Sequence, residues 1–403
     1  MKLLYVTKQL PYGETEAFIL PEVASHRAAG WEVWLAPAQL GRLVHDEAAK
    51  LESATLRAGL VSPAVLLAFI AEFLRDPLRV LGWGAIAARS GRLALRNLAV
   101  WPKGVWLGRQ IRRLGIDHVH IHWASVPATF GMIAADIGRR PFSITAHRYD
   151  IAQGNLLPLK ARRARFIRAI DRRGADELSA QIGAAGPAPR LLHMGVRLGD
   201  KLAPRRAGAL DTVRLVMAAR FVEKKGHIVF LDAFNALGDA GLCGALDLFG
   251  SGPLEGVVRE RATSLGLSEQ VHFRGVLSHN DLLDRLASGD YDIAVLPSVV
   301  AQDQDREGIP VFLMEAMAAG LPVVSTPNGG IVELAEGGAC RLAPERDSGA
   351  LAAAITELAA DPAAREQLAE AGRRRVLDSF EIEACMSRLR SWIVGGPADA
   401  PPQ

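Results

Sequence analysis

Short apolar runs that suit β-strands alternate with amphipathic helical patterns along almost the whole chain of 403 residues. The first half contains KLLYVT, WEVWLA, DHVHIHW and PFSITA, and the second half contains TVRLVMAA, ALDLFG, QVHFRG, DIAVLP, LPVVST and GACRLA. Strands that alternate with helices build parallel sheets covered by helices. The pattern therefore predicts an α/β fold, and the chain length suits two domains better than one.

The polar stretch RLGDKLAPRRAGALD interrupts this alternation and is typical of a domain linker. Two facing Rossmann-like domains place a ligand cleft between them, at the carboxyl ends of their strands. A helical insertion rich in Leu, Ala and Arg separates WEVWLA from DHVHIHW, at roughly 45–114. We predict two Rossmann-like domains, an amphipathic helix that crosses back over the join, and a tail, at 1–197, 198–380, 381–396 and 397–403.

Cysteine usage and hydropathy indicate the compartment. The three cysteines, Cys243, Cys340 and Cys385, have no paired or metal-type spacing, which fits a reducing environment. The first residues have too short an apolar core for a signal peptide and read as a strand. The longest apolar run, AVLLAFIAEFL at 64–74, contains Glu72 and is too short to cross a bilayer. We therefore expect a cytoplasmic protein that is not an integral membrane protein.

The net charge of +3 conceals an asymmetry between the two halves of the chain. Residues 1–200 hold 27 Lys and Arg against 16 Asp and Glu, and the remainder hold 20 against 28. A basic first half suggests an anionic partner, such as a membrane surface or a phosphorylated acceptor, and docking of the two halves is the alternative. The segment LKARRARFIRAIDRRG at 159–174 could contact acidic lipid or be a solvated face. It has no recognition-helix pattern, so nucleic acid is not expected.

The segment ARFVEKKGH directly follows the strand-like run TVRLVMAA. It places Arg220 and Lys225 in a strand-to-helix turn and Gly226 at the start of the helix. Two cations beside the free N–H groups of a helix N-terminus can bind a diphosphate, which needs both charge and directed donors. Solvated loop cations are the alternative, and the segment alone leaves both interpretations open.

The turn Gly250-Ser251-Gly252 follows ALDLFG and would let the backbone approach a phosphate or a base. It is close to a dinucleotide fingerprint, but the spacing to Gly256 is one residue too long and Pro253 opens the helix. It is therefore weak support for a dehydrogenase, and a plain tight turn is the alternative.

The stretch EGIPVFLMEAMAAGLPVV carries two glutamates on an apolar background. Glu307 precedes Gly308, which frees the backbone for contact with a ligand, and Pro310, which suits the first turn of a helix. Glu315 falls within that helix, where a buried carboxylate costs stability unless a donor pairs with it. Ribose hydroxyls would be suitable donors, and an exposed helix face is the alternative.

Two further patterns could suggest a metal. Asp303-Gln304-Asp305 spells the D-x-D of metal-dependent sugar transferases, but it lies in a loop with no evident third ligand and we interpret it as a solvated pair. His118, His120 and His122 alternate on one face of a strand without a carboxylate or cysteine placed beside them. We therefore predict no metal and no cofactor.

Polar residues also follow strands of the first half. SITAHRYDI places His147 and Asp150 at a strand's carboxyl end, where a histidine could bind or orient a sugar or transfer a proton. A structural cap on the turn is the alternative. Gly13, in PYGETEAF after the first strand, could let that loop approach a ligand.

Taken in order, these segments resemble family 4 of the retaining glycosyltransferases, which have the two-domain GT-B fold. ARFVEKKGH, FGSGP, VHFRGVLS and EGIPVFLMEAMAAGLPVVST with GGIVEL resemble the family's motifs over most of 211–380. ETEAFILPEV, HVHIHWASVPATFGMIAADIG and FSITAHRYDI are similar to the bacterial exopolysaccharide, colanic-acid-type branch. Three positions depart from the pattern, with Ala219 in place of glycine, Arg148 after the histidine, and Asp171 in place of serine.

The resemblance implies a role for each matching residue. Arg220 and Lys225 would bind the donor diphosphate, Glu315 the ribose and Glu307 the donor sugar. The implied catalytic residues are His147, Arg220, Lys225 and Glu307, and His147 with Asp150 would lie near the transferred sugar and the acceptor. The implied donor-binding residues are Gly13, Arg220, Lys225, Gly250, Gly252, Gly275, Val276, Glu307, Gly308, Ile309, Pro310, Val311 and Glu315.

The resemblance further implies a metal-independent hexosyltransferase that uses a UDP- or GDP-linked sugar and retains its anomeric configuration. We expect a lipid-linked or growing polysaccharide acceptor, in surface or exopolysaccharide synthesis, and a location on the inner face of the plasma membrane. A small soluble acceptor and a non-catalytic sugar-nucleotide-binding scaffold are the alternatives. No nucleic-acid partner is expected.

Overall fold

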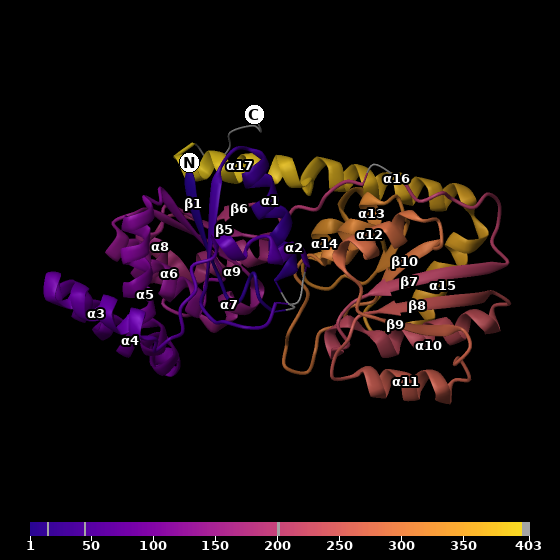
Figure 1. Cartoon of the computed structure of the whole chain (residues 1–403). Coiled ribbons are helices and arrows are strands. Elements are labelled where there is room, and N and C mark those ends of the chain that lie inside the picture. Colours follow the sequence, from indigo (N-terminus) through magenta and orange to yellow (C-terminus); the bar gives the residue numbers. More distant parts are fainter. Residues whose placement is uncertain (14–15, 44–45, 200–201, 397–403) are drawn as a thin grey trace. The chain divides into compact units, whose positions relative to one another are not determined.

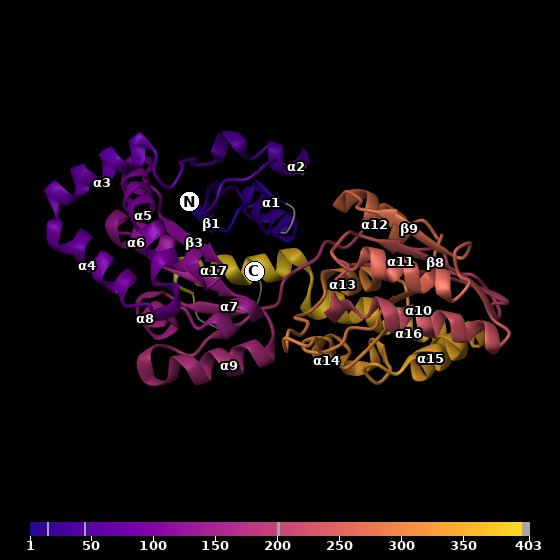
Figure 2. The same cartoon turned by 90° about the horizontal axis from the view of Figure 1, so that it is seen from below.

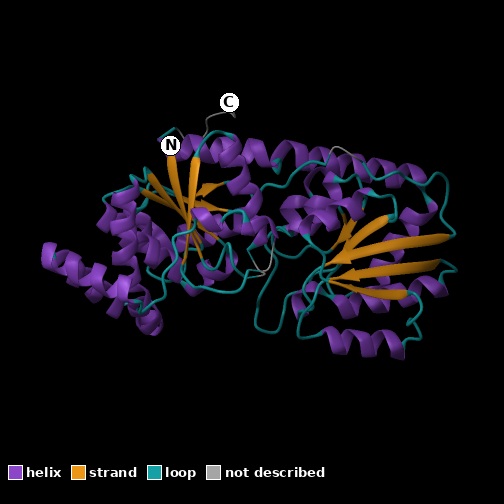
Figure 3. Cartoon of the chain, in the orientation of Figure 1, coloured by secondary structure: helices purple, strands orange, loops and turns teal. Residues whose placement is uncertain are grey.

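The computed structural model describes residues 1–13, 16–43, 46–199 and 202–396, and the chain forms two compact units (Figure 1). The first unit comprises Met1–His193 and the last helix from Glu383 onward, and the second comprises Met194–Ile382. The division falls a little before the boundary predicted at 197. Each unit contains strands flanked by helices (Figure 3), so the predicted α/β fold with a last helix that crosses back is confirmed.

The sheet of the first unit has the order β2-β1-β3-β4-β5-β6, and its neighbouring strands are parallel. The order reverses between β1 and β3, and ligands bind at such a switch point in doubly wound sheets. The strands are β1 (Lys2–Thr7), β2 (Glu32–Pro37), β3 (His118–His122), β4 (Phe142–Ala146), β5 (Ile167–Ala169) and β6 (Arg190–Leu191).

The helices of the first unit form successive layers on this sheet. Helix α6 packs on the strands, α5 packs on α6, and α3 and α4 pack on α5. The stretch between β2 and β3 is therefore largely helical, as predicted. The helices are α1 (Leu20–Ala28), α2 (Asp46–Ala49), α3 (Pro63–Arg75), α4 (Pro77–Ala88), α5 (Ala94–Leu114), α6 (Val126–Gly138), α7 (Arg148–Gln153), α8 (Leu157–Arg163), α9 (Arg172–Ile182) and α17 (Ile382–Val394).

Local sequence explains where α3 and α4 begin. The Ser62 hydroxyl accepts a hydrogen bond from the N–H of Val65, and the Asp76 carboxylate accepts one from the N–H of Arg79. A proline follows each of these caps, where its missing N–H costs nothing. Short polar side chains therefore start both helices. Within the described ranges, no helix is both long enough and apolar enough to span a bilayer.

The sheet of the second unit has the order β12-β11-β10-β7-β8-β9 and is also parallel. Its switch point lies between β7 and β10, the two strands that precede ARFVEKKGH and the paired-glutamate motif. The strands are β7 (Thr212–Ala218), β8 (Cys243–Phe249), β9 (Val271–Gly275), β10 (Ile293–Leu296), β11 (Val323–Ser325) and β12 (Arg341–Leu342), and all six predicted runs are confirmed as strands.

The helices of the second unit cover this sheet, and its apolar core lies between them. Asp361 caps α16 through two backbone N–H groups, and Pro362 follows it in the first turn. The helices are α10 (His227–Asp239), α11 (Glu255–Ser264), α12 (His279–Ala287), α13 (Val311–Ala318), α14 (Ile331–Leu334), α15 (Ser348–Ala360) and α16 (Pro362–Ser379).

The basic segment at 159–174 is partly buried and partly exposed. Its middle forms the interior strand β5, and Lys160 and Arg168 are fully buried. Lys160 Nζ donates hydrogen bonds to the carbonyls of Ala124 and Ser125, so its ammonium is paired within the protein. The other five cations of the segment, Arg162, Arg163, Arg165, Arg172 and Arg173, are exposed, so a charged surface is confirmed for them and contact with lipid stays a prediction.

Candidate functional site

The donor-binding residues predicted in the second unit lie in the loops at the ends of β7, β8, β9 and β10 and in helix α13. Arg220 and Lys225 follow β7, and Glu307 lies between β10 and α13. Gly250 and Gly252 follow β8, and Gly275 ends β9 with Val276 after it. The fold thus gathers these segments at the carboxyl edge of one sheet, beside its switch point.

Lys225 and Glu307 are in direct contact although 82 positions separate them. Lys225 Nζ lies 2.7 Å from Glu307 Oε2, and Lys224 Nζ lies 3.7 Å from Oε1. Glu307 is only 4% exposed, and its Oε1 has no hydrogen-bond partner among the described residues. A buried carboxylate oxygen of this kind can accept a hydrogen bond from a ligand hydroxyl.

Arg220 differs from Lys225 in its surroundings. Its side chain is exposed and makes no ion pair or hydrogen bond within the described part of the chain. An exposed guanidinium at the end of β7 can pair with a phosphate in a bidentate manner. The two predicted diphosphate cations therefore lie in one loop, and only Lys225 is held by a carboxylate of the protein.

The Glu307 loop is held by residues that the sequence analysis did not identify. Asn328 Oδ1 accepts the N–H of Glu307 at 2.9 Å, and Asn328 Nδ2 donates to Glu345 Oε1 at 2.9 Å. Gly329 has a φ of +55°, and a Cβ there would lie 1.9 Å from the carbonyl oxygen of Glu307. Any side chain at Gly329 would displace the Glu307 loop. The GGIVEL segment, which contains Gly329, therefore supports that loop.

The glycine turn after β8 packs against the neighbouring loops. The N–H of Gly250 donates to the carbonyl of Gly275 at 2.8 Å. Gly250 has a φ of +125°, and a Cβ there would lie 2.1 Å from the carbonyl oxygen of Ala219. Contact within the protein is sufficient to require this glycine, and contact with a donor stays a prediction.

Glu315, a carboxylate with apolar neighbours in the sequence, has a partner within the protein. It is 4% exposed in α13, and His279 Nε2 lies 2.5 Å from its Oε1. The alternative of an exposed helix face is therefore wrong. Sequence patterns could not identify His279, because the pair is 36 positions apart and joins the first residue of α12 to α13.

The D-x-D segment lies on the surface, as predicted. Asp303 and Asp305 are exposed, Asp303 Oδ1 accepts the N–H of Asp305, and Lys224 Nζ lies 2.9 Å from Asp305 Oδ2. The acidic pair therefore has a cationic side chain as its neighbour, which disfavours a divalent metal there.

In the first unit, Glu16 fixes the loop after β1 in which Gly13 lies. Glu16 is buried and accepts the N–H groups of Lys8, at 3.0 Å, and Leu10, at 2.8 Å. The indole N–H of Trp123 donates to the same carboxylate at 2.5 Å. Trp123 has a φ of +77°, which is strained for a bulky residue, and such strain is concentrated at functional sites.

His147 lies next to this strained tryptophan. The ring centroids of His147 and Trp123 are 4.3 Å apart, and His147 Nε2 lies 3.3 Å from His122 Nδ1. The Asp150 carboxylate accepts the N–H groups of His147, at 2.9 Å, and of Ala124, at 2.7 Å. Burial raises the pKa of Asp150 to about 7, and these two donors oppose that rise. Asp150 thus joins the ends of β3 and β4.

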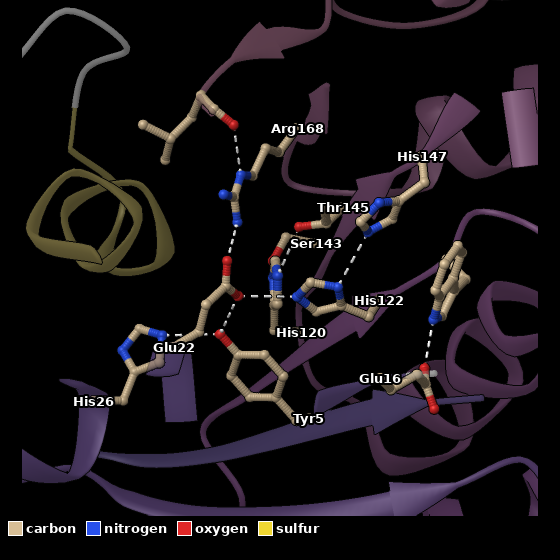
Figure 4. A network of polar contacts seen from close by, with 12 residues as sticks. Tyr5, Glu16, Glu22, His26, His120, His122, Ser143, Thr145, His147 and Arg168 are labelled. Atoms are coloured by element: carbon tan, nitrogen blue, oxygen red, sulfur yellow. Dashed lines mark hydrogen bonds and ion pairs between the residues drawn. The ribbon is translucent and has the colours of Figure 1, made fainter. Parts of the chain in front are cut away.

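The His147 ring belongs to a network of polar side chains on the sheet of the first unit (Figure 4). His122 Nε2 lies 2.9 Å from Glu22 Oε2, so the ring N–H donates to the carboxylate. His147 Nε2 faces His122 Nδ1, and the His147 side chain also accepts the N–H of Asp150 in a capping box at the start of α7. Burial lowers the pKa of His147, and His122 and Arg168 lower it further. These features favour an uncharged His147 ring that caps α7, as the structural alternative expects, and they disfavour protonation of a leaving group by His147.

Glu22, His120 and His122 bring three potential metal ligands together. Both ring nitrogens of His120 already pair with Ser143 and Thr145, at 2.8 and 3.0 Å. The Arg168 guanidinium lies 2.8 Å from Glu22, so a divalent ion would be placed beside a buried cation. These contacts fit an internal hydrogen-bond network better than a metal site.

Two departures from the family pattern lie close together in the first unit. Arg148 Nη1 is 4.0 Å from Asp171 Oδ1 and 3.1 Å from Glu177 Oε2. Asp171 also caps α9 by accepting the N–H of Gly174 at 2.6 Å. Asp171 therefore provides both a capping side chain for α9 and a partner for Arg148.

Buried histidines give the first unit a pH dependence that can be tested. Burial lowers the pKa of His26 and His118 to about 3, below the value near 6.5 expected when the chain is unfolded. The unfolded chain then binds more protons below pH 6.5, so stability is present above that pH and is lost as the pH falls.

We expect the thermal midpoint of the first unit to fall between pH 7 and pH 5, and to fall less in His118→Gln. Each such histidine contributes up to about 1.4 kcal/mol per pH unit in this window. Tryptophan fluorescence can follow this unit alone, because all seven tryptophans lie within it. An equal fall in both proteins would contradict the assignment of His118 as a neutral buried ring.

Residues 204–375 match the family model described as Glycosyl transferases group 1. The putative colanic acid biosynthesis glycosyltransferase WcaL of Salmonella typhimurium is 36% identical over 181 residues, which is 44% of each chain. A GDP-mannose-dependent phosphatidylinositol monomannoside mannosyltransferase of Mycolicibacterium smegmatis is 28% identical over 334 residues, covering 77% of this chain and 86% of that one. The match with WcaL thus covers less than half of that relative's length.

Solved structures share the fold over nearly the full length. The Anabaena HepE protein in complex with UDP-glucose superimposes with a TM-score of 0.71, and the match covers 97% of this chain and 98% of that one. Sequence identity is 16%, so this likeness shows the fold alone.

Proposed function

We propose that this chain, whose residues 204–375 form a group 1 glycosyltransferase domain, transfers a hexose from a UDP- or GDP-linked sugar to a saccharide acceptor. The observation that carries the proposal is the Lys225–Glu307 pair at the switch point of the second sheet, with a buried carboxylate oxygen that lacks a hydrogen-bond partner among the described residues. A cation for a diphosphate and an acceptor for a sugar hydroxyl thus lie side by side.

In the proposed reaction the bond between the sugar's anomeric carbon and the diphosphate breaks, and the acceptor hydroxyl forms the new bond on the same face. Arg220 and Lys225 stabilise the charge that develops on the diphosphate, and this electrostatic effect supplies most of the catalysis. The leaving phosphate takes the acceptor's proton, so no enzyme nucleophile, metal or cofactor is required. His147 lies beside the transferred sugar.

The acceptor is proposed to be a lipid-linked or growing polysaccharide, and the enzyme to work at the inner face of the plasma membrane. The colanic acid and phosphatidylinositol mannoside relatives support an acceptor of this class. The pairing of Arg148 with Asp171 falls near the proposed acceptor side, so acceptor choice is where this chain should differ most from those relatives.

The experiment is a thermal-shift screen of the full chain against UDP- and GDP-linked hexoses, followed by donor hydrolysis with the best ligand. A bound nucleotide sugar raises the midpoint in proportion to the logarithm of its concentration. Binding with turnover supports the proposal. Binding without any hydrolysis or transfer would indicate the non-catalytic scaffold, and no binding to any donor would overturn both.

Glu315→Gln should raise the donor KM by about 10- to 100-fold, with a much smaller change in kcat. The expected loss corresponds to hydrogen bonds from ribose hydroxyls to a charged acceptor, at about 1.5–3 kcal/mol. Initial rates over a range of donor concentrations provide the measurement. His279→Asn is the matched control, because it removes the protein partner and keeps the carboxylate. An unchanged donor KM in Glu315→Gln would contradict the ribose contact and indicate that Glu315 has a structural role only.

A further inference from the structure

Helices α3 and α4 expose an unusual number of large apolar side chains. Helix α3 is apolar around most of its circumference, because Val65 faces the protein while Leu67 and Leu74 are 68% and 76% exposed. Helices with apolar residues on all sides are ordinarily buried, and exposed patches of this kind mark interaction sites. We call this surface the α3–α4 apolar face, and it consists of Leu60, Val61, Leu66, Leu67, Ile70, Phe73, Leu74, Leu78 and Leu81.

The opposite sides of these helices are firmly attached to the unit. Phe69 packs edge-on against Trp101 of α5, with ring centroids 5.0 Å apart. Trp83 of α4 donates its indole N–H to Asp136 of α6 at 2.8 Å. The α3–α4 apolar face is therefore presented by anchored helices, and Figure 2 shows both helices at the edge of the first unit, on the side of α5.

The charges around this face are almost all positive. Residues 55–114 contain ten Lys and Arg but only two acidic residues. Both carboxylates are engaged, since Glu72 is buried against Arg109 and Arg112, and Asp76 caps α4. Burial would raise the pKa of Glu72, but the two guanidinium groups outweigh it and hold the pKa below its usual value.

Three exposed arginines in α3, after α4 and at the start of α5 make no ion pair within the described ranges. They are Arg75 at the end of α3, Arg89 after α4 and Arg96 in the first turn of α5. Residues 55–114 thus have a net charge of +8, from ten basic minus two acidic residues, and residues 159–174 have +6, from seven minus one. The segment 159–174, in contrast, directs Lys160 and Arg168 inward.

We propose that the α3–α4 apolar face docks on the surface of an anionic lipid bilayer. Its leucines would enter the boundary between headgroups and acyl chains, and Arg75, Arg89 and Arg96 would lie against anionic headgroups. A second copy of the chain is a poorer occupant, because a two-fold contact would bring the same arginines of both copies together. The proposal specifies the peripheral-membrane part of the proposed function and is independent of the donor chemistry.

The test is flotation of the full chain with vesicles of phosphatidylcholine, alone or mixed with phosphatidylglycerol. We expect binding to the mixed vesicles only. Leu67→Gln, Leu74→Gln and Leu78→Gln combined should lower the partition coefficient at least about tenfold, since each change removes a large apolar group from the interface. Arg75→Gln, Arg89→Gln and Arg96→Gln combined should lower it on the order of 100-fold, from about 1 kcal/mol per basic residue.

A matched control replaces two exposed apolar residues of the second unit, with Val257→Gln and Leu377→Gln combined, and should float like the wild type. Donor hydrolysis in detergent should be equal in all variants, which shows that they are folded. Flotation of the leucine variant at the wild-type level would overturn the proposal, as would a wild-type dimer that the leucine variant dissociates without any vesicle binding. Vesicle binding with no hydrolysis would instead count against the proposed function alone.

Discussion

Lys225→Ala is expected to lower the turnover number for donor cleavage by about 10²- to 10³-fold, the usual effect of removing one preorganised stabiliser of a developing anion. Lys225 Nζ lies 2.7 Å from Glu307, and its side chain is only 17% exposed. A positive charge held there needs little reorganisation when charge moves onto the leaving diphosphate. Single-turnover assays at saturating donor separate this effect from weaker donor binding.

Lys224→Ala is the matched control for this prediction. Lys224 precedes Lys225, but its Nζ pairs with exposed Asp305 at 2.9 Å and lies 3.7 Å from Glu307. Removal of the Lys224 side chain should lower the turnover number by less than about tenfold, as expected for a pair near the surface. Equal losses in the two variants would show that general positive charge matters and that Lys225 has no particular role. A thermal midpoint for each variant excludes loss of folding as the cause.

The parts of the fold that the sequence predicts are those with strong local signals. Long apolar strands, proline and glycine at helix starts, and the polar break between the halves all act over a few residues. Strands β5 and β6 were not predicted, because they are short and carry arginine. Arg168 reads as a surface cation in the sequence and is buried because Glu22, far away in the chain, neutralises it.

The candidate site shows the same division between local and distant information. Loop positions such as Glu307 and Lys225 follow from strand ends and motif order, so sequence alone places them at one sheet edge. Their supports Asn328 and Glu345, and the partner His279, are joined by contacts between separate elements and leave no local pattern. Which atoms contact the donor stays a prediction, because the contacts within the protein define the positions of these side chains and do not identify a ligand.

Arg168→Met should destabilise the first unit by about 3–5 kcal/mol, the usual cost of removing one partner of a buried ion pair. Arg168 Nη1 lies 2.8 Å from Glu22 Oε1, and both side chains are fully buried. Burial would raise the pKa of Glu22, but the charges of Arg168 and His122 outweigh it and hold the pKa well below its usual value. The variant therefore leaves an ionised carboxylate in the core with Tyr5 and His122 as its remaining partners.

Urea unfolding followed by tryptophan fluorescence measures this loss in the first unit, where all the tryptophans lie. Arg173→Met is the matched control, because Arg173 pairs with Glu177 at the surface and its removal should cost no more than about 1 kcal/mol. Adding Glu22→Gln to Arg168→Met removes the stranded charge, so the double variant should be more stable than Arg168→Met alone. A double variant that is less stable than Arg168→Met would mean that Glu22 contributes mainly through its contacts with Tyr5 and His122, and that the buried charge is not what makes Arg168 necessary.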